Sequence, residues 1–415
     1  MNTKSKQLIQ NTIIVAIGKI CTQFVSFILL PFYTAYLTSK QYGVVDLLNT
    51  YISLLIPLVF LQIDQAVFRF LIDTRDNNKK KSSLITTTLF FVTIESFLYI
   101  VVYLLVSSFV SNNYKIFLGV NVIAAMYSNL ILQISRGMGD NKNYSYGCIV
   151  SGIGTILLNI ILVKFHNMGA YGVLISSLIA NILCTVFVFI KKNMYKYIHI
   201  QSLNINYLKK MLKYSIPLVP NMLSWWIINV SDRTLISALI SISANGVYSV
   251  SNKFSSIFIS VFNIFNMTWS ESASMYIKDK ERDLFFSKVV NEAMILFSTA
   301  CICGIAIMPL VFNILISGES YKEAYNQISI LFVATIFNIF VSLLGSVYVA
   351  LKKTKEIAKT SIYAAIINII LNLIFIKYIG LYAASISTLI AYFIMSIYRF
   401  VDIKKYVNIV LDKKN

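Results

Sequence analysis

Twelve long apolar stretches separated by short polar loops constrain this chain of 415 residues more than any other feature. Each is about 20 residues or longer, enough for a helix to cross the hydrocarbon core of a bilayer. Backbone groups find no water there, and helices of this length satisfy them internally. We therefore expect an all-α polytopic membrane protein with twelve transmembrane helices. The stretches lie at about 11–37, 43–68, 84–110, 114–135, 146–165, 170–190, 214–240, 244–268, 289–316, 325–350, 357–377 and 380–400.

Lysine and arginine are distributed very unevenly between the loops. Three of the 36 lie deep inside apolar stretches, and five lie in one alternating set of loops or at the stretch ends beside them. The remaining 28 lie in the other set of loops, at the stretch ends beside them, and in the two tails, the C-terminal tail being counted from Arg399. Since cytoplasmic loops are rich in these residues, both termini are predicted to be cytoplasmic. The five are Lys40, Lys115, Lys164, Lys322 and Lys377.

The same bias explains the formal net charge of +19 without a nucleic-acid partner, because the charge sits on scattered short loops and not on one basic surface. The composition is 57% apolar and only 13% charged, as in an integral membrane protein. The five cysteines lie in apolar stretches, the two histidines lie in loops, and no metal-ligand or catalytic motif occurs. We expect no cofactor, no metal site and no enzymatic activity.

The two halves of the chain resemble each other. LLNIILVKFHNMGAYGVLISSLIA, from Leu157, aligns with ILNLIFIKYIGLYAASISTLIA, from Ile370, and places Asn159 opposite Asn372. A weaker similarity, between LTSKQYGV and ISISANGV, places Gly43 opposite Gly246. Two blocks of six spans enter the membrane in the same direction, which predicts two six-helix lobes related by a pseudo-twofold axis along the membrane normal.

We place the N-terminal lobe at residues 1–192, a cytoplasmic linker at 193–213 and the C-terminal lobe at 214–415. The interface of the lobes is the expected substrate route, and rocking between them would give alternating access. Within the linker, the stretch from Tyr207 to Tyr214 is typical of a short interfacial helix.

Placing a charged side chain in the membrane costs free energy, so we treat each charged residue inside an apolar stretch as a candidate functional residue. Lys19 and Gln23 share one face of the first stretch. On the eighth stretch, polar residues recur at intervals of three and four, which puts them on one helix face. We expect these faces to line a wet substrate cavity, although hydrogen bonding to adjacent helices would also explain them. The second face comprises Ser249, Lys253, Ser256, Ser260 and Asn263.

Asp232 and Arg233 are adjacent, so they project about 100° apart on a helix and need not pair with each other. An ion pair that closes an outer gate, or ties this helix to a neighbour, is as reasonable as substrate binding. Arg69 can pair with Asp73 four residues later, which favours an anchor at the helix end over a gate. Glu95 is an acid within the third stretch that has no evident partner in the sequence.

Four segments carry a resemblance to bacterial polysaccharide-unit flippases of the multidrug/oligosaccharidyl-lipid/polysaccharide exporter superfamily. They are the opening NTIIVAIGKICTQFVSFILLPFYTAYLTSKQYGVVDLL, the segment YSIPLVPNMLSWWIINVSDRTLISALISISANGVYSVSNKFSSIF, the short GESYKEAY and the asparagine-rich eleventh stretch. Members of this superfamily share two six-helix lobes around a central cavity, the MATE-like fold.

The resemblance implies transport of undecaprenyl-diphosphate-linked oligosaccharide from the inner to the outer leaflet of the bacterial cytoplasmic membrane, for surface polysaccharide assembly. Polysaccharide polymerase and glycosyltransferases are the implied protein partners. Lys19 and Lys253 would contact the diphosphate, with Arg233 or Arg69 secondary. Serine, asparagine and glutamine side chains would contact sugar hydroxyls.

Two alternatives remain open. Ion-coupled drug antiporters of the same superfamily typically carry an acid in the first span or deep in the N-terminal lobe, and the first span of this chain carries Lys19 instead. A membrane glycan polymerase or ligase would act on the same lipid-linked sugars, but the short outer loops give such an enzyme little platform.

Overall fold

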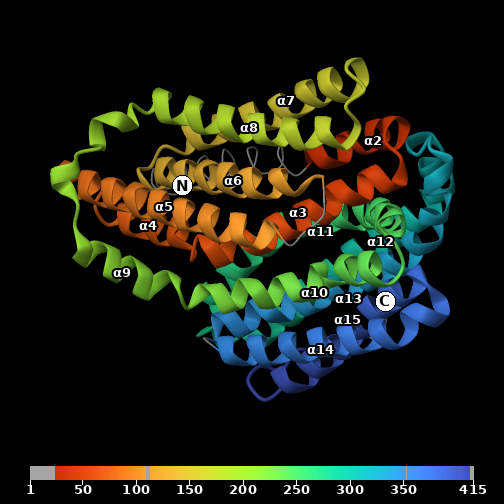
Figure 1. The fold of residues 1–415 in the computed structure, drawn as a ribbon. Helices are drawn as coiled ribbons and strands as arrows, with labels where there is room; N and C mark the ends of the chain where they lie inside the picture. Colours follow the sequence, from red (N-terminus) through yellow and green to blue (C-terminus); the bar gives the residue numbers. More distant parts are fainter. Residues whose placement is uncertain (1–23, 109–112, 352, 412–415) are drawn as a thin grey trace. The chain divides into compact units, whose positions relative to one another are not determined.

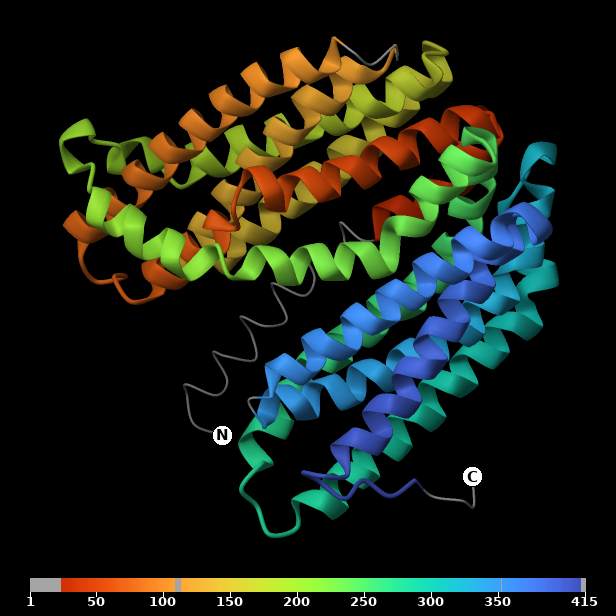
Figure 2. The ribbon, with the colours of Figure 1, turned by 60° about the horizontal axis from the view of Figure 1, so that its bottom comes forward.

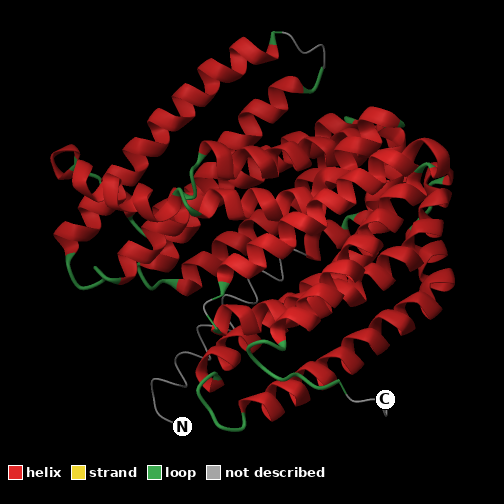
Figure 3. Ribbon diagram, turned by 90° about the horizontal axis from the view of Figure 1, so that it is seen from below, coloured by secondary structure: helices red, strands yellow, loops and turns green. Residues whose placement is uncertain are grey.

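The computed structural model describes residues 24–108, 113–351 and 353–411. Within these ranges the regular structure consists entirely of helices, and no strand is present (Figures 1 and 3). Nine of these helices are long and apolar enough to cross a membrane. The expectation of an all-helical, multi-pass membrane protein is thereby confirmed, on the length and composition of the helices.

Contacts divide the chain into two compact units. Unit 1 falls within Met1–Leu29 and Leu48–Leu223, and unit 2 within Leu30–Leu47 and Ser224–Asn415. These units do not coincide with the expected lobes, because residues 30–47 pack with the C-terminal unit. The lobe boundaries therefore stay a prediction.

Unit 1 is a helical bundle with one continuous apolar core, to which α4, α5, α6 and α8 contribute buried side chains. The helix α8 packs along both α6 and α7, and α6 packs along α4. Its elements are the later part of α3 (Ser39–Val59), α4 (Ile63–Ile72), α5 (Asn78–Ser107), α6 (Lys115–Gly137), α7 (Asn141–Asn159) with the π-helix η1 (Ile160–Phe165), α8 (Gly169–Lys191), the 3-10 turns η2 (Met194–Tyr197) and η3 (Ile200–Ser202), α9 (Ile205–Ser215) and the first turn of α10 (Leu218–Leu239).

The second apolar stretch, expected to be one span over 43–68, is interrupted. The helix α3 ends at Val59, and α4 begins at Ile63. Between them Leu61 and Gln62 have positive φ angles of 46° and 56°, and Pro57 lies in the last turn of α3. Proline removes a helical hydrogen bond and left-handed residues cannot continue the helix, so the chain bends here.

The expected linker folds as part of unit 1. The predicted amphipathic segment forms α9, whose Met211 is completely buried against the unit 1 core. Hydroxyl groups of α5 donate to carbonyls of the linker: Ser82 and Thr86 to Tyr197, and Ser83 to Ser202. The segment after α8 is therefore held against α5 along its length.

Unit 2 is arranged around α13 (Tyr325–Ala350), which packs against α11 (Ile242–Tyr276), α12 (Arg282–Leu315) and α15 (Leu381–Ile403). In Figure 2, α13, α14 and α15 lie side by side in blue. The remaining elements are α2 (Leu30–Tyr36), the start of α3, most of α10, the 3-10 turn η4 (Glu319–Ala324) and α14 (Thr354–Ile379).

Arg399 lies inside α15 and is 1% exposed, so counting it with a cytoplasmic tail was wrong. Its guanidinium group donates to the carbonyls of Val341 and Ile357 and to the hydroxyls of Thr360 and Ser361. The charge is thus stabilised by neutral acceptors on α13 and α14, and it fastens three helices together.

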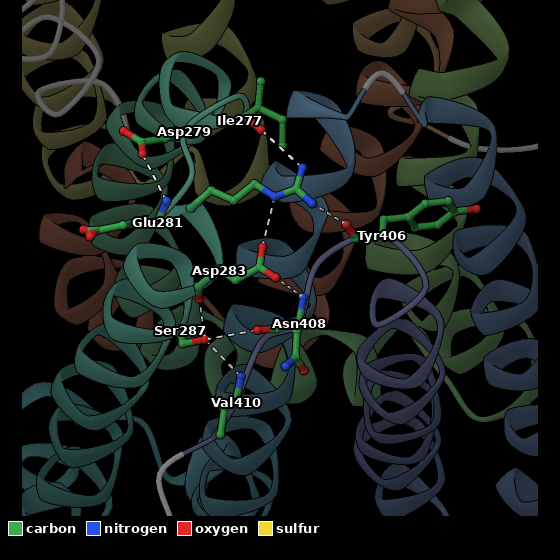
Figure 4. Close-up of polar contacts among 9 residues, drawn as sticks. Ile277, Asp279, Glu281, Asp283, Ser287, Tyr406, Asn408 and Val410 are labelled. Carbon is green, nitrogen blue, oxygen red and sulfur yellow. Dashed lines mark hydrogen bonds and ion pairs between the residues drawn. The ribbon is translucent and has the colours of Figure 1, made fainter.

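The segment after α15 runs along the start of α12 (Figure 4). Asp283 and Ser287, one turn apart on α12, exchange hydrogen bonds with the backbone of Asn408 and Val410. Arg282 donates to the carbonyls of both Ile277 and Tyr406, which joins the end of α11 to this segment. The side chains of Val407 and Ile409 are buried in the apolar core beneath it.

The helices α3 and α11 meet backbone to backbone at two glycines within unit 2. A Cβ on Gly43 would lie 1.9 Å from the carbonyl oxygen of Ile242, and a Cβ on Gly246 would lie 2.0 Å from that of Ser39. The Oγ atoms of Ser39 and Ser243 are 2.6 Å apart beside this contact. The two glycines that the repeat aligned therefore touch each other.

We predict that Gly246→Ala will lower the free energy of unfolding by about 3 kcal/mol, because the added methyl group overlaps a backbone oxygen that cannot move alone. Thermal unfolding of the purified protein in detergent measures this. Gly154→Ala in α7 is the matched control, since its Cβ would meet only ordinary contacts at 3.8 Å. Equal melting temperatures for the two variants would contradict the close contact.

Candidate functional site

An ion pair joins α10 to the start of α3. Arg233 Nη1 lies 3.1 Å from Asp46 Oδ1, and the two side chains are 18% and 7% exposed. Asn245 of α11 donates to the carbonyl of Gly43 at 3.1 Å and approaches the second oxygen of Asp46 at 3.5 Å. An ion pair that ties the helix of Arg233 to a neighbour is therefore present, and substrate binding by Arg233 stays a prediction.

Asp232 faces a separate set of neutral donors and is 4% exposed. Thr388 and Tyr248 donate to its Oδ2 at 2.7 and 3.2 Å, and Asn372 donates to its Oδ1 at 2.8 Å. The amide group of Asn368 lies 3.1 Å from Oδ1, within reach of a further bond. The carboxylate therefore joins α10, α11, α14 and α15, and among the described residues it has no cationic partner, Arg233 included.

Lys253 lies 11 residues into α11, about 16 Å from the beginning of the helix. Its side chain is half-buried, within the electrostatic influence of Asp46 and Arg233. Its ammonium group forms no hydrogen bond or ion pair with another residue of the described part of the chain. Arg233 is neutralised by Asp46, so Lys253 supplies the excess positive charge of this cluster.

The expected polar face of α11 exists, but its members differ in role. Ser249 is fully buried, and its hydroxyl has no partner within the described residues. Ser256 and Ser260 donate to carbonyls of their own helix, at 2.8 and 2.9 Å, and Asn263 is exposed. Such local bonds satisfy a serine hydroxyl without a ligand.

A cavity of about 260 Å³ opens within unit 2 beside these residues. It is large enough for several water molecules or a phosphate-sized group. Ser256 lines it, whereas Lys253, Ser260 and Asn263 do not. The polar lining comprises Asp232, Arg233, Tyr248, Asn252, Ser255, Ser256, Thr335, Asn338, Thr388 and Tyr392.

The other predicted site residues are not brought to this cluster. Arg69 of α4 pairs with Asp73 at 2.6 Å, with both side chains about half exposed, as the helix-end anchor reading expected. Lys19 and Gln23 lie outside the described residues. Among the described residues, no group of three or more histidine, cysteine, aspartate or glutamate side chains could hold a metal ion.

Comparison with known proteins shows the family to which the chain belongs. The sequence matches the family described as "Polysaccharide biosynthesis protein" over residues 8–270, well over half of the chain. The chain belongs to this family. The resemblance inferred from the opening segment and from the segment around Asp232 and Arg233 is thereby confirmed. No curated protein sequence matches this polysaccharide biosynthesis protein significantly.

Solved structures show that the polysaccharide biosynthesis protein has the MATE-like fold of the MOP superfamily. An inward-facing multidrug resistance MATE family transporter has a TM-score of 0.75 at 13% identity, with 94% of this chain and 98% of that chain covered. An outward-facing transporter of the same description has a TM-score of 0.65 at 14% identity, covering 95% and 93%. A MOP superfamily transporter from Pyrococcus furiosus, described as having a binding pocket of reverse polarity, has a TM-score of 0.63 at 13% identity, covering 96% and 95%. The similarity to these structures shows the fold of the chain.

We predict a strong energetic coupling between Asp46 and Arg233 in this polysaccharide biosynthesis protein. Asp46→Asn or Arg233→Gln alone should lower the free energy of unfolding by about 3 kcal/mol, because each leaves a buried charge unpaired. The double variant should lose less than the sum, as a thermal double-mutant cycle will show. The exposed pair Arg69–Asp73 is the control and should show little coupling. Additive losses at Asp46 and Arg233 would rule out a functional pair.

Proposed function

We propose that the protein is a flippase that moves undecaprenyl-diphosphate-linked oligosaccharide from the inner to the outer leaflet by alternating access. Lys253 carries the proposal: it is a cation well inside α11, a helix that we place in the membrane, and it forms no ion pair with another described residue. A lipid diphosphate is an anion that remains within the bilayer region, so it could neutralise this charge where water is scarce.

Two further polar groups support an anionic ligand here. The Nε of Arg233 and the hydroxyl of Ser249 are buried without a hydrogen-bond partner within the described residues. Phosphate oxygens accept such bonds, and arginine binds phosphate in a planar geometry. Arg233, Lys253 and Asp46 together carry one positive charge in excess, while Asp232 is already satisfied by neutral donors.

The membership of the polysaccharide biosynthesis family supports the glycan-lipid substrate, and the fold supports transport. We place the protein in the bacterial cytoplasmic membrane with both termini cytoplasmic. Adding α10, α11 and the apolar stretch 11–37 to the nine candidate spans gives the twelve helices of two six-helix lobes. Lys19 and Gln23 would then provide a second polar face, and a polysaccharide polymerase and glycosyltransferases would act beside the transporter.

We predict that Lys253→Ala will abolish surface polysaccharide and leave lipid-linked oligosaccharide on the inner leaflet, because the diphosphate loses its main cation. Lys253→Arg should retain partial activity, since it keeps the charge with a different shape. Surface polymer, inner-leaflet intermediate and protein abundance are measured together. Lys322→Ala, at an exposed pair with Glu319, is the matched control and should export normally. Normal polymer in the Lys253→Ala strain would disprove the diphosphate assignment.

The rival function, an ion-coupled drug antiporter, gives a different phenotype. Deletion would then increase sensitivity to cationic dyes and leave surface glycans intact. The positive excess around Lys253 opposes this reading, because a cationic drug would meet like charge there.

A further inference from the structure

Apolar side chains are exposed on the segment that joins α8 to α9 in unit 1 (Figure 1). Lipid accounts for exposed apolar residues on a membrane span, but this segment follows the end of α8 and lies outside the spans. Ile200 is 82% exposed and Ile205 is 62% exposed. A group of such side chains outside a span marks a surface that contacts another molecule. We refer to the group as the linker tip, and it comprises Tyr195, Ile198, Ile200, Leu203 and Ile205.

Hydrogen bonds to α5 fix the backbone of the linker tip. The hydroxyl of Thr86 donates to the carbonyl of Tyr197 at 2.9 Å and accepts from the backbone amide of His199 at 3.1 Å. The hydroxyl of Thr87 accepts from the backbone amide of Asn204 at 3.0 Å. The backbone on both sides of Ile200 is therefore held in place, and the side chain of Ile200 stays outside the core of unit 1.

The same threonines set the level of the linker tip along α5. Thr86 is eight residues after Asn78, the first residue of α5, which is about 12 Å along the helix. The third apolar stretch begins at about residue 84, and α5 is one of the nine helices long and apolar enough to cross a membrane. The linker tip therefore lies beside the start of a candidate span, at the level expected for lipid headgroups.

The apolar face of α9 is already covered by protein. Its members pack against the core of unit 1 and comprise Tyr207, Leu208, Met211 and Leu212. The exposed side of α9 presents Lys209, Lys210 and Lys213 instead. The linker tip is thus the apolar surface that this region offers to a membrane, and α9 adds positive charge beside it.

This positive charge has no acidic counterpart nearby in the sequence. No aspartate or glutamate occurs between Asn141 and Ser231, and the preceding acid, Asp140, pairs with Lys192 at 2.8 Å. The side chains of Lys196, Lys209, Lys210 and Lys213 form no ion pair with another described residue. Phosphate groups of anionic lipids complement such a cluster, and each lysine near an anionic membrane surface strengthens binding about fivefold.

We propose that the linker tip is a membrane-surface anchor specific for anionic phospholipid. Its apolar side chains insert into the cytoplasmic leaflet, while Lys196 and the lysines of α9 bind lipid phosphate groups. An acidic cytoplasmic protein would complement the same charge. The level of the linker tip, beside the start of α5, favours lipid, because apolar side chains at that level meet the boundary between headgroups and acyl chains.

Photocrosslinking of the full chain in nanodiscs of phosphatidylglycerol and phosphatidylcholine tests the insertion. Ile200→p-benzoylphenylalanine should give lipid adducts that mass spectrometry detects. Lys280, an exposed residue in the loop between α11 and α12, is the matched control position, and the same replacement there should give at least about tenfold less adduct. Equal adduct at the two positions would overturn the insertion and leave the linker tip as a surface for a protein partner.

Titration with lipid in mild detergent tests the specificity for negative charge, with thermal unfolding as the readout. Phosphatidylglycerol should raise the melting temperature at lower concentration than phosphatidylcholine does. A triple variant, Lys196→Gln with Lys209→Gln and Lys210→Gln, should keep the melting temperature of the lipid-free protein, since these side chains are exposed. Its half-saturating phosphatidylglycerol concentration should rise at least about tenfold.

The matched control for the triple variant is Lys278→Gln with Lys280→Gln, which removes exposed lysines from a different loop and should leave the titration unchanged. Equal half-saturating concentrations for the triple variant and the natural protein would overturn the phosphate contacts, as would an equal response to the two lipids. Neither measurement needs a transported substrate, so the result stands apart from success or failure of the flippase assignment.

Discussion

A charge inside the hydrocarbon region must be paired, bonded to neutral dipoles or removed by a proton, because water is not there to solvate it. Unit 2 uses the first two solutions at separate places. Arg233 is paired with Asp46, whereas Asp232 and Arg399 are surrounded by amide, hydroxyl and carbonyl groups. These arrangements connect α10, α11, α13, α14 and α15. The polar contacts that stabilise the buried charges therefore also hold the helices of unit 2 together. Lys253 stands out because its ammonium group makes none of these contacts with the described residues.

The positions of the important residues could be predicted from the sequence, but their partners could not. A charge within an apolar stretch is visible in a sequence, and Arg233, Asp232 and Lys253 were found in this way. Asp46 is 187 positions before Arg233, and no local pattern connects them. The asparagines and the threonine around Asp232 come from α14 and α15, and the sequence signals for them were the asparagine-rich eleventh stretch and the repeat that aligned Asn372 with Asn159. Arg399 was misplaced because charge at the end of a span is usually a topology signal, and only packing reveals that this one is buried.

The internal repeat shows that equivalent positions in the two halves of the chain can have different roles. Asn159 and Asn372, which the repeat aligned, are both fully buried. In unit 1, Asn159 donates to the carbonyl of Thr155 in its own helix. In unit 2, Asn372 donates to Asp232 on another helix. The same side chain therefore closes a local bond in one unit and supports a buried acid in the other, which the sequence similarity alone did not distinguish.

The segment that follows α15 is recognised mainly through its backbone, since the side chains of α12 bond to amide and carbonyl groups of Asn408 and Val410. Side-chain identity is thus almost free at the outward-facing positions, but length is not. Val407 and Ile409 alternate with Asn408 as in a strand, so loss of one residue would reverse the alternation and turn a polar side chain into the core. This segment should therefore tolerate substitutions at its exposed positions better than an insertion or a deletion.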